Sequence, residues 1–320
     1  MTGSYVHTVS LMGTVVTIQV VGHGADRRER LEREEGVARA FDWFHQIERD
    51  CTRFDERSEI RRLSAHVGES VPVSAMLFEA VRFALAVAKE SGGAFDPTVG
   101  LDMEARGFNR EYRRGGLVRT SLEPTDAISY RDVRLDPERQ TITLLHPLVL
   151  DLGAVAKGLA IDMAARELEP FSNFAIDAGG DLYLGGCNAD GKPWSVGIRH
   201  PRDEHDLIET LRVSDVAVCT SGDYERKSPS GHAGHHIVDP RTGASATAAA
   251  SVTVLASSAM VADALATAAF VLGPADGLQL LECHGADGLI VTPALERFTT
   301  PGMCSDYHLD RPDAPAARDH

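Results

Sequence analysis

The spacing of apolar residues in the first hundred positions predicts one strand and two helices. A β-branched run at residues 15–21 lies between Gly13 and Gly22, which predicts a strand entered from a tight turn. Apolar residues then recur every three to four positions across residues 27–49, the period of a helix with one buried face and polar, exposed first turns. The same period across residues 74–91 predicts a second helix, stopped by two consecutive glycines.

The middle of the chain is less regular. A loop at residues 94–100 leads into residues 101–140, which are rich in arginine and lack periodicity, so we expect a surface excursion there. Residues 141–150 resume as strands around Pro147, and a turn at residues 151–154 leads into a helix. The expected inner face of that helix consists of Val155, Leu159, Met163 and Leu168.

Short apolar runs separated by turns then predict several strands and one further helix. The strands are expected at residues 174–176, 182–184, 194–198, 216–219, 252–256 and 289–292, and the helix at residues 260–272. Strands and helices are mixed without regular β–α alternation, and no G-x-G-x-x-G motif follows a strand. The pattern therefore favours an α+β fold over a doubly wound one.

Composition and charge narrow the class of protein. Of the 320 residues, 43% are apolar and 25% are charged, which is typical of globular proteins and excludes disorder as the main state. The 32 Lys and Arg against 47 Asp and Glu give a net charge of −15. This acidic balance argues against nucleic acid or an anionic membrane as the main partner.

Cysteine usage and the apolar segments favour a cytoplasmic protein. The five cysteines are scattered and form no C-x-x-C pair, so we expect reduced thiols. The first twenty residues lack the pattern of a secretory signal. The long apolar stretch at residues 251–273 carries Asp263 at its middle, which is unfavourable in lipid, so we expect a buried strand and helix there.

Two hard oxygen donors lie one turn apart on the predicted helix at residues 260–272. Asp263 and Thr267 are at positions i and i+4, so their side chains project from one face. Few hard oxygen ligands suit Mg²⁺, which keeps waters and shares a phosphate oxygen with a substrate. The same pair is equally compatible with an Asp near a helix start and a Thr that bonds to its own backbone.

Two other segments combine turns with chemically active side chains. Residues 151–158 join a strand to a helix start, where free N–H groups attract phosphate and Lys157 adds a cation, although Asp151 could be an ordinary helix cap. Residues 236–243 read His-Ile-Val-Asp-Pro-Arg-Thr-Gly. His236 in that segment could act as a general base, or it could be a surface or core histidine.

Taken together and in order, eight sequence blocks resemble the FAD:protein FMN transferase (ApbE) family. The resemblance spans residues 10 to about 293, and eight blocks in the family's order make a chance match very improbable. The blocks are Met12–Thr14, Phe54 with Ser58–Ile60, Gly93–Gly100, Asp151–Gly158, Ala175–Asp181, Thr220–Tyr224, His236–Gly243 and Ala262–Thr267.

The resemblance implies a fold, an activity and a set of site residues. It implies one α+β domain over residues 1–300, made of two packed halves with a ligand cleft between them, and a C-terminal tail over residues 301–320. It implies transfer of FMN from FAD to a Thr or Ser hydroxyl of an acceptor protein, with Mg²⁺ on the pyrophosphate and release of AMP. Carried over by position, the Mg²⁺ ligands are the Ala154 carbonyl, Asp263 and Thr267, and His236 is the base. The FAD contacts are Met12, Phe54, Ala94, Phe95, Asp96, Asp151, Lys157 and Ile237.

The chain departs from the family pattern in two places and matches an acceptor pattern in a third. Residues 101–106 replace the usual Pro-Leu and aromatic-rich segment, and Phe54 stands where Tyr is frequent, which keeps a stacking face. Residues 239–245 fit the Asp-x-x-Thr-Gly-Ala-Ser/Thr pattern of acceptor proteins, which would make Ser245 a site of self-modification. We expect this match to be accidental, because Asp-Pro-x-Thr-Gly already belongs to the enzyme's own motif.

Three functions remain open from the residues alone. The first is the transferase. The second is a pyrophosphatase that uses water and gives FMN and AMP, because an activated phosphorus does not by itself discriminate between water and a hydroxyl. The third is a flavin-binding protein without turnover, against which the presence of His236, Asp263 and Thr267 argues.

Overall fold

An antiparallel sheet of eight strands runs through the chain. The computed structural model describes residues 3–22, 26–110, 116–120, 128–227 and 234–305, together with Leu122 and Tyr307. Within these residues the strand order is β1-β2-β6-β7-β10-β13-β14-β15. The strands are β1 (Gly3–Leu11), β2 (Thr14–Gly22), β6 (Phe174–Ala178), β7 (Asp181–Gly185), β10 (Val216–Gly222), β13 (Ser251–Ala256), β14 (Asp287–Val291) and β15 (Arg297–Thr299).

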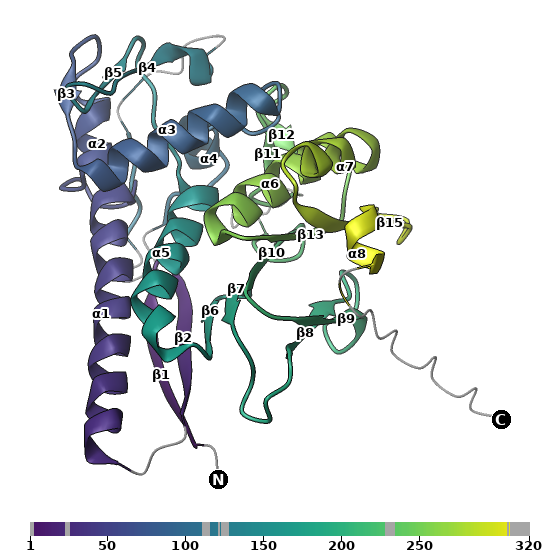
Figure 1. The fold of residues 1–320 in the computed structure, drawn as a ribbon. Helices are drawn as coiled ribbons and strands as arrows, with labels where there is room; N and C mark the ends of the chain where they lie inside the picture. Colours follow the sequence, from purple (N-terminus) through teal and green to yellow (C-terminus); the bar gives the residue numbers. More distant parts are fainter. Residues whose placement is uncertain are drawn as a thin grey trace.

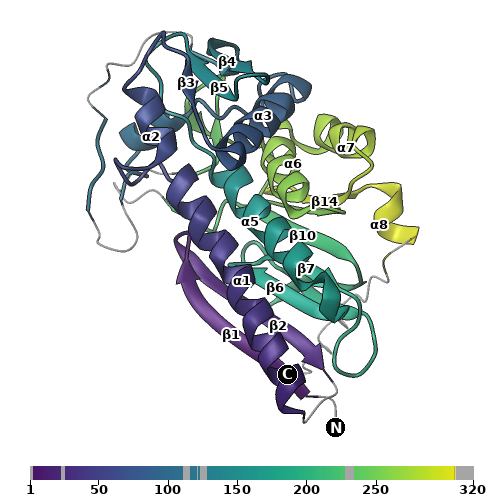
Figure 2. The same cartoon turned by 60° about the vertical axis from the view of Figure 1, so that its left-hand side comes forward.

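Three helices pack against this sheet, as Figures 1 and 2 show: α1 (Arg27–Cys51), α5 (Gly153–Leu168) and α6 (Ala259–Leu272). Helix α1 contacts β1 and β2, α5 contacts β6 and β7, and α6 contacts β10 and β13. Helix α5 also packs against both α1 and α6. It is therefore the central helix of this layer.

Smaller elements surround the sheet and its helices. Two further pairs of strands and a three-stranded sheet, order β3-β5-β4, complete the strands of the described residues. These strands are β3 (Val71–Pro72), β4 (Val133–Asp136), β5 (Thr141–Leu144), β8 (Trp194–Arg199), β9 (Leu207–Val213), β11 (Val238–Asp239) and β12 (Ala244–Ser245). The other helices are α2 (Glu59–Ser64), α3 (Ala75–Glu90), α4 (Gly100–Ala105), α7 (Pro274–Cys283), α8 (Pro301–Ser305) and two 3-10 turns, Tyr130–Asp132 and Glu169–Phe171.

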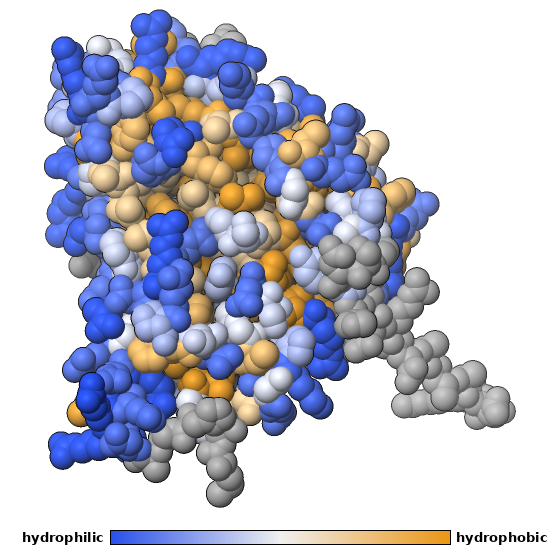
Figure 3. Space-filling model, in the orientation of Figure 1, coloured by the Kyte–Doolittle hydropathy of each residue, from blue (hydrophilic) through white to orange (hydrophobic). Residues whose placement is uncertain are grey.

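Apolar side chains cover one face of the large sheet and the central part of the other. Along β10, Ala217 and Cys219 belong to the core beneath the helices, while Val216 and Val218 belong to a second cluster that includes residues of β8 and β9. Because successive side chains of a strand point to opposite faces, one strand contributes to both clusters. The face turned to the viewer in Figure 3 has apolar residues gathered across its middle, with hydrophilic residues around them.

Helices α5 and α6 meet at a glycine and are joined by a carboxylate. A Cβ atom on Gly158 would lie 2.5 Å from the Ala259 carbonyl oxygen, so only glycine allows this approach. Asp162 accepts hydrogen bonds from the Ser258 hydroxyl (2.6 Å) and from the backbone N–H groups of Ala259 (2.6 Å) and Met260 (3.0 Å). The first N–H groups of a helix have no partner within the helix. A side chain of α5 thus caps α6.

Most long elements lie where the apolar pattern places them. The strand expected at residues 15–21 lies within β2, and the helices expected at residues 27–49, 74–91 and 260–272 correspond to α1, α3 and α6. Ser74 caps α3 by accepting a hydrogen bond from the Leu77 N–H (3.2 Å). The mixed architecture agrees with the α+β expectation.

Other expectations need correction. The arginine-rich segment at residues 101–140 is not a plain surface excursion, because its described part contains most of α4, a 3-10 turn and β4. Only Thr141–Leu144 of the strands expected at residues 141–150 is a strand. β1, β9, α2 and α7 were not predicted. Residues 301–305 form α8, whose Met303 is fully buried. The loose tail expected at residues 309–320 lies outside the described residues.

The apolar helices are short. Among the described residues, none of the helices combines the length and the hydropathy that crossing a membrane requires. The apolar stretch at residues 251–273 is instead the buried strand β13 followed by the buried helix α6.

The cap between α5 and α6 yields the first prediction. Replacing Asp162 by Ala removes the acceptor of three part-buried donors, so we expect the free energy of unfolding to fall by about 1–3 kcal/mol. Urea unfolding followed by circular dichroism measures this change. Asp42→Ala, at an exposed position of α1, is the control and should stay within about 0.5 kcal/mol of the wild type. Equal stability of the two variants would contradict the role of Asp162.

Candidate active site

Two adjoining cavities open between the end of α1 and the starts of α5 and α6. We call them the main cavity, with a volume of about 540 Å³, and the side cavity, of about 300 Å³. They share six lining residues, namely Arg53, Phe54, Asp151, Gly153, Lys157 and Arg226. Volumes of this order are typical of cofactor and substrate sites.

The structure brings the sequence-predicted site residues together. All twelve except Met12 line the main cavity, and Met12 lines the side cavity. These residues come from segments up to more than 200 positions apart in the chain. No single motif predicts that the others lie beside it. The fold is what brings these residues to one place.

The start of α5 contributes a backbone carbonyl and a cation. At Ala154 the backbone leaves helical geometry (φ −93°, ψ 16°), which turns its carbonyl away from the usual helical direction. One turn later, Lys157 forms an ion pair with Asp181, which is 2% exposed. Burial lowers the pKa of Lys157, but the charges of Asp181 and Asp263 outweigh it and raise that pKa above its ordinary value. Lys157 is therefore a fixed positive charge in the cavity wall.

Helix α6 contributes two hard oxygen donors to the same cavity. Asp263 is buried, and its Oδ2 has no hydrogen-bond partner within the part of the chain that the structure describes. The Thr267 hydroxyl lies 3.2 Å from that of Ser221. Burial raises the pKa of Asp263 to about 7, against the opposing charge of Lys157. A buried carboxylate oxygen without a partner destabilises the ligand-free site, and a cation would relieve that penalty.

A metal at this point would depend on mixed ligands. Among the residues that the structure describes, no three His, Cys, Asp or Glu side chains form a metal-binding group. The Ala154 carbonyl, the Asp263 carboxylate and the Thr267 hydroxyl are all oxygen donors of the kind that Mg²⁺ prefers. The residues present therefore fit a magnesium ion that completes its coordination with water or substrate oxygens.

The two neighbouring histidines are in different environments. The Nε2–H group of His235 donates a hydrogen bond to the Ala246 carbonyl (2.8 Å), and the ring of His235 packs against Phe270. His236 lines the main cavity, and its Nδ1 is buried without a partner. Burial, followed by the charge of Arg226, lowers the pKa of His236 to about 3. His236 is thus a neutral imidazole at pH 7, able to accept a proton, whereas His235 is structural.

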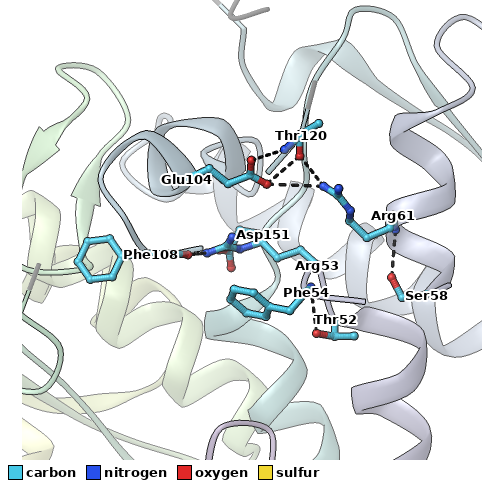
Figure 4. Close-up of polar contacts among 9 residues, drawn as sticks. All are labelled: Thr52, Arg53, Phe54, Ser58, Arg61, Glu104, Phe108, Thr120 and Asp151. Atoms are coloured by element: carbon cyan, nitrogen blue, oxygen red, sulfur yellow. Dashed lines mark hydrogen bonds and ion pairs between the residues drawn. The ribbon is translucent and has the colours of Figure 1, made fainter. Parts of the chain in front are cut away.

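The wall shared by the two cavities is built around Arg53. Its Nε donates to Asp151 Oδ2 (2.6 Å), and its Nη2 donates to the Phe108 carbonyl. The guanidinium carbon lies 4.3 Å from the centre of the Phe54 ring, and Figure 4 shows the two side chains next to each other. The other oxygen of Asp151 accepts from the Gly153 N–H (2.7 Å). Burial raises the pKa of Asp151, but the charge of Arg53 and the hydrogen bonds from Gly153 and Arg53 together outweigh it, so the pKa is lowered and the carboxylate is an anion.

Two other predicted residues are held by their own loops. Asp96 accepts hydrogen bonds from the Thr98 N–H (2.9 Å) and hydroxyl (2.7 Å) and from the Tyr130 N–H (2.9 Å). Its carboxylate therefore stabilises the loop after α3 in addition to lining the cavity. Met12 lies in the turn between β1 and β2, where its N–H donates to Glu48 Oε1 (2.9 Å). Ala94, Phe95 and Ile237 are buried apolar members of the wall.

Sequence reasoning missed several residues of this site. Arg53, Glu225 and Arg226 line the main cavity, as do Met103, Phe108 and Arg110 from the segment expected to be a surface excursion. Asp181 holds Lys157. The sequence gives a weak signal for these residues, because each lies in or beside a motif block. Arg53 precedes Phe54, Glu225 and Arg226 follow the Thr220–Tyr224 block, and Asp181 ends the Ala175–Asp181 block. The role of Phe108 had no signal of its own.

Comparisons with known proteins place this geometry in a family context. The model of the ApbE family matches residues 12–290. The FAD:protein FMN transferase of Vibrio cholerae is 31% identical over 266 residues, which cover 79% of this chain and 78% of the relative. That of Treponema pallidum is 30% identical over 313 residues, which cover 88% and 83%.

Solved structures agree with these sequence matches. A crystal structure of the ApbE protein from Thermotoga maritima has a TM-score of 0.80 at 30% identity, and the match covers 94% of this chain and 98% of that one. The flavin transferase ApbE from Vibrio cholerae has a TM-score of 0.79 at 27% identity, with the same coverage. The α+β fold expected from the sequence is confirmed by these likenesses.

The environment of His236 yields the second prediction. Because burial lowers its pKa to about 3, the imidazole should stay neutral as the pH falls from 8 to 5, whereas a free histidine titrates near 6.5. NMR of the imidazole carbon-bound protons measures this titration, with the resonance assigned by its loss in His236→Gln. A short unstructured peptide that contains one histidine is the control. A midpoint near 6.5 for His236 would contradict the buried, neutral state.

Proposed function

Because the chain belongs to the ApbE family, we propose that it is an FAD:protein FMN transferase that attaches FMN to a Thr or Ser hydroxyl of an acceptor protein and releases AMP. The family and the transferase class implied by the sequence motifs are confirmed by the matches. The observation that carries the finer proposal is the convergence of Lys157, His236, Asp263 and Thr267 on one cavity.

The cavity residues suit the binding of a dinucleotide. Phe54, Phe95 and Ile237 offer apolar and aromatic surface for a ring system, with Ala94 and Met12 at its edges. The positive charges of Lys157 and Arg226 suit a pyrophosphate. Asp151 and Asp96 offer carboxylate oxygens to ligand N–H or O–H groups. Apolar lining with a few polar groups is the usual composition of such sites.

The transfer itself needs a base and charge neutralisation. In the proposed reaction, the hydroxyl oxygen of the acceptor forms a bond to the phosphorus of the FMN half, and the bond from that phosphorus to the bridging oxygen breaks, so that AMP leaves with that oxygen. His236 takes the hydroxyl proton: its imidazole is neutral before the reaction, and the negative charge that develops on the phosphate raises the pKa of His236 as the transfer proceeds. Lys157 contributes positive charge where negative charge develops.

The proposed Mg²⁺ site consists of the Ala154 carbonyl, Asp263 and Thr267. When bound, the ion would neutralise charge on the pyrophosphate. Helices α5 and α6 hold the two halves of this ligand set, and Gly158 and Asp162 keep the helices together. The partners follow from the same proposal: FAD, and an acceptor protein that presents an Asp-x-x-Ser/Thr-Gly-Ala-Thr/Ser segment. The cytoplasmic location stays a prediction.

The experiment that tests the proposal follows both halves of FAD. The purified protein is incubated with FAD and Mg²⁺, with and without a small domain that carries Asp-x-x-Ser-Gly-Ala-Thr, and the products are resolved by liquid chromatography and mass spectrometry. We expect AMP together with an FMN-modified acceptor. AMP with free FMN irrespective of acceptor would instead establish the pyrophosphatase. Intact FAD throughout would contradict both enzymatic functions and favour a flavin-binding protein.

Removing the carboxylate of α6 should stop the reaction. Asp263→Asn keeps the shape of the side chain and removes its charge, so we expect Mg²⁺-dependent AMP release to fall on the order of a hundredfold or more. Asp276→Ala, at an exposed position of α7, is the matched control and should keep wild-type activity. Initial rates of AMP formation across a Mg²⁺ titration measure the effect. Unchanged AMP release by Asp263→Asn would refute the metal assignment.

The acceptor-like segment of the chain should not be modified. The Ser245 hydroxyl donates to the His235 carbonyl (2.8 Å) and accepts from the His235 N–H (3.0 Å) and from the guanidinium of Arg106. These contacts keep the hydroxyl from acting as a nucleophile, which supports an accidental match. We expect the intact mass of the protein to be unchanged after incubation with FAD and Mg²⁺. A mass increase by one FMN that disappears in Ser245→Ala would contradict this.

A further inference from the structure

Arg53 occupies an unusual place for a charged side chain. It is 5% exposed, and it lies in the wall that separates the main and side cavities. Its guanidinium contacts three groups at once: the Asp151 carboxylate, the Phe108 carbonyl and the face of the Phe54 ring. Figure 4 shows the side chain reaching from the end of α1 toward Asp151 and Phe108, with the Phe54 ring next to it.

These contacts join the chain after α1 to two segments that are far from it in the sequence. Asp151, which precedes α5, is 98 positions from Arg53 in the sequence. Phe108, which follows α4, is 55 positions from Arg53. Phe54 lies in the loop after α1. The planar fork of a guanidinium can donate in two directions and still offer its face to a ring, which the ammonium group of lysine cannot do. Arg53 therefore fixes the relative positions of three cavity segments.

The contribution of Arg53 to stability alone does not account for this arrangement. Its Nη1 is buried and has no hydrogen-bond partner among the described residues. A buried charge with an unsatisfied donor is unfavourable, and well-packed apolar residues are often at least as stabilising as a buried ion pair. We therefore attribute the presence of a guanidinium here to the geometry that it imposes on the cavity.

We propose that Arg53 is a positioning residue for the flavin dinucleotide, because it holds the Phe54 ring and the Asp151 carboxylate in their ligand-binding orientation and ties the loop at Phe108 to them. The inference rests on the proposed function, which assigns this cavity to FAD. In this role Arg53 lowers the binding free energy by pre-organising the site, since side chains that are already fixed lose less freedom when the ligand binds.

The same region supplies a matched control. Arg61 is also a buried arginine that pairs with a carboxylate, Glu104, at 3.6 Å, and its Nη1 donates to the Thr120 hydroxyl (2.5 Å). Thr120 in turn donates to Glu104 through its N–H (2.9 Å) and its hydroxyl (2.8 Å). Figure 4 shows this network above Arg53. Arg61 lines neither cavity. An Arg61 variant therefore shows the effect of losing such an arginine without a change in the geometry of the site.

The test compares FAD binding by two single variants. Arg53→Met and Arg61→Met are titrated with FAD by calorimetry, in the presence of EDTA and without acceptor, so that no turnover occurs. We expect the dissociation constant to rise on the order of tenfold to a hundredfold for Arg53→Met, the range found when groups that orient a site's contacting residues are removed. For Arg61→Met we expect a change of less than twofold, although both variants lose thermal stability.

Two further variants distinguish positioning from a general effect on folding. Arg53→Lys keeps the charge near Asp151 but cannot hold three groups, so it should recover part of the affinity that Arg53→Met loses. In the Asp151→Asn background, Arg53→Met should weaken binding much less than in the wild type, because part of its effect is exerted through that carboxylate. Lysine rescue also keeps the test valid if Arg53→Met does not fold.

The outcomes for the inference and for the function are distinct. Equal FAD affinity of the wild type, Arg53→Lys and Arg53→Met would overturn the role of Arg53, even if the wild type transfers FMN. Full additivity of the Arg53 and Asp151 changes would overturn the coupling between the two side chains. If the wild type binds FAD but releases no AMP, the proposed function fails, whereas weaker binding by Arg53→Met still supports the positioning role.

Discussion

The close approach of α5 and α6 is the constraint on which the site depends. Gly158 lets the two helices touch, and Asp162 of α5 caps the first turn of α6. Ala154 lies four residues before Gly158, and Asp263 lies four residues after Ala259, so the position of one oxygen donor relative to the other follows from the helix packing. Because packed helices shift little, a site built from them is more exact than one built from loops.

Around this contact the cavity concentrates charges of both signs in a buried place. Lys157 pairs with Asp181, and Arg53 pairs with Asp151. Asp263, whose charge acts on Lys157, has an oxygen without a hydrogen-bond partner among the described residues. Fixed charges of this kind interact strongly because little water screens them. They also destabilise the ligand-free protein, since buried polar atoms without partners are unfavourable. A ligand with phosphates, rings and a bound cation would satisfy several of them together.

The sequence predicts the local parts of this arrangement better than the contacts between distant parts. Periodicity placed α1 and α3, because each has one apolar face, and a continuous apolar stretch placed α6, which is buried almost all round. The motifs located residues that share the main cavity. β1 was missed because its hairpin is largely exposed and polar. Arg53 and Asp181 were missed because their roles depend on partners 98 and 24 positions away, which no local pattern encodes. The segment around Phe108 was predicted to be a surface excursion because it is rich in arginine, and only a few of its residues line the cavity.

We propose that FAD binds across the starts of α5 and α6, with a magnesium ion between these two helix starts. A crystal structure of the protein with FAD and Mg²⁺ tests it most directly. We expect the pyrophosphate beside Lys157 and a metal at about 2.0–2.1 Å from the Ala154 carbonyl, Asp263 and Thr267 oxygens. FAD bound away from the main cavity, or a metal held by other residues, would contradict it.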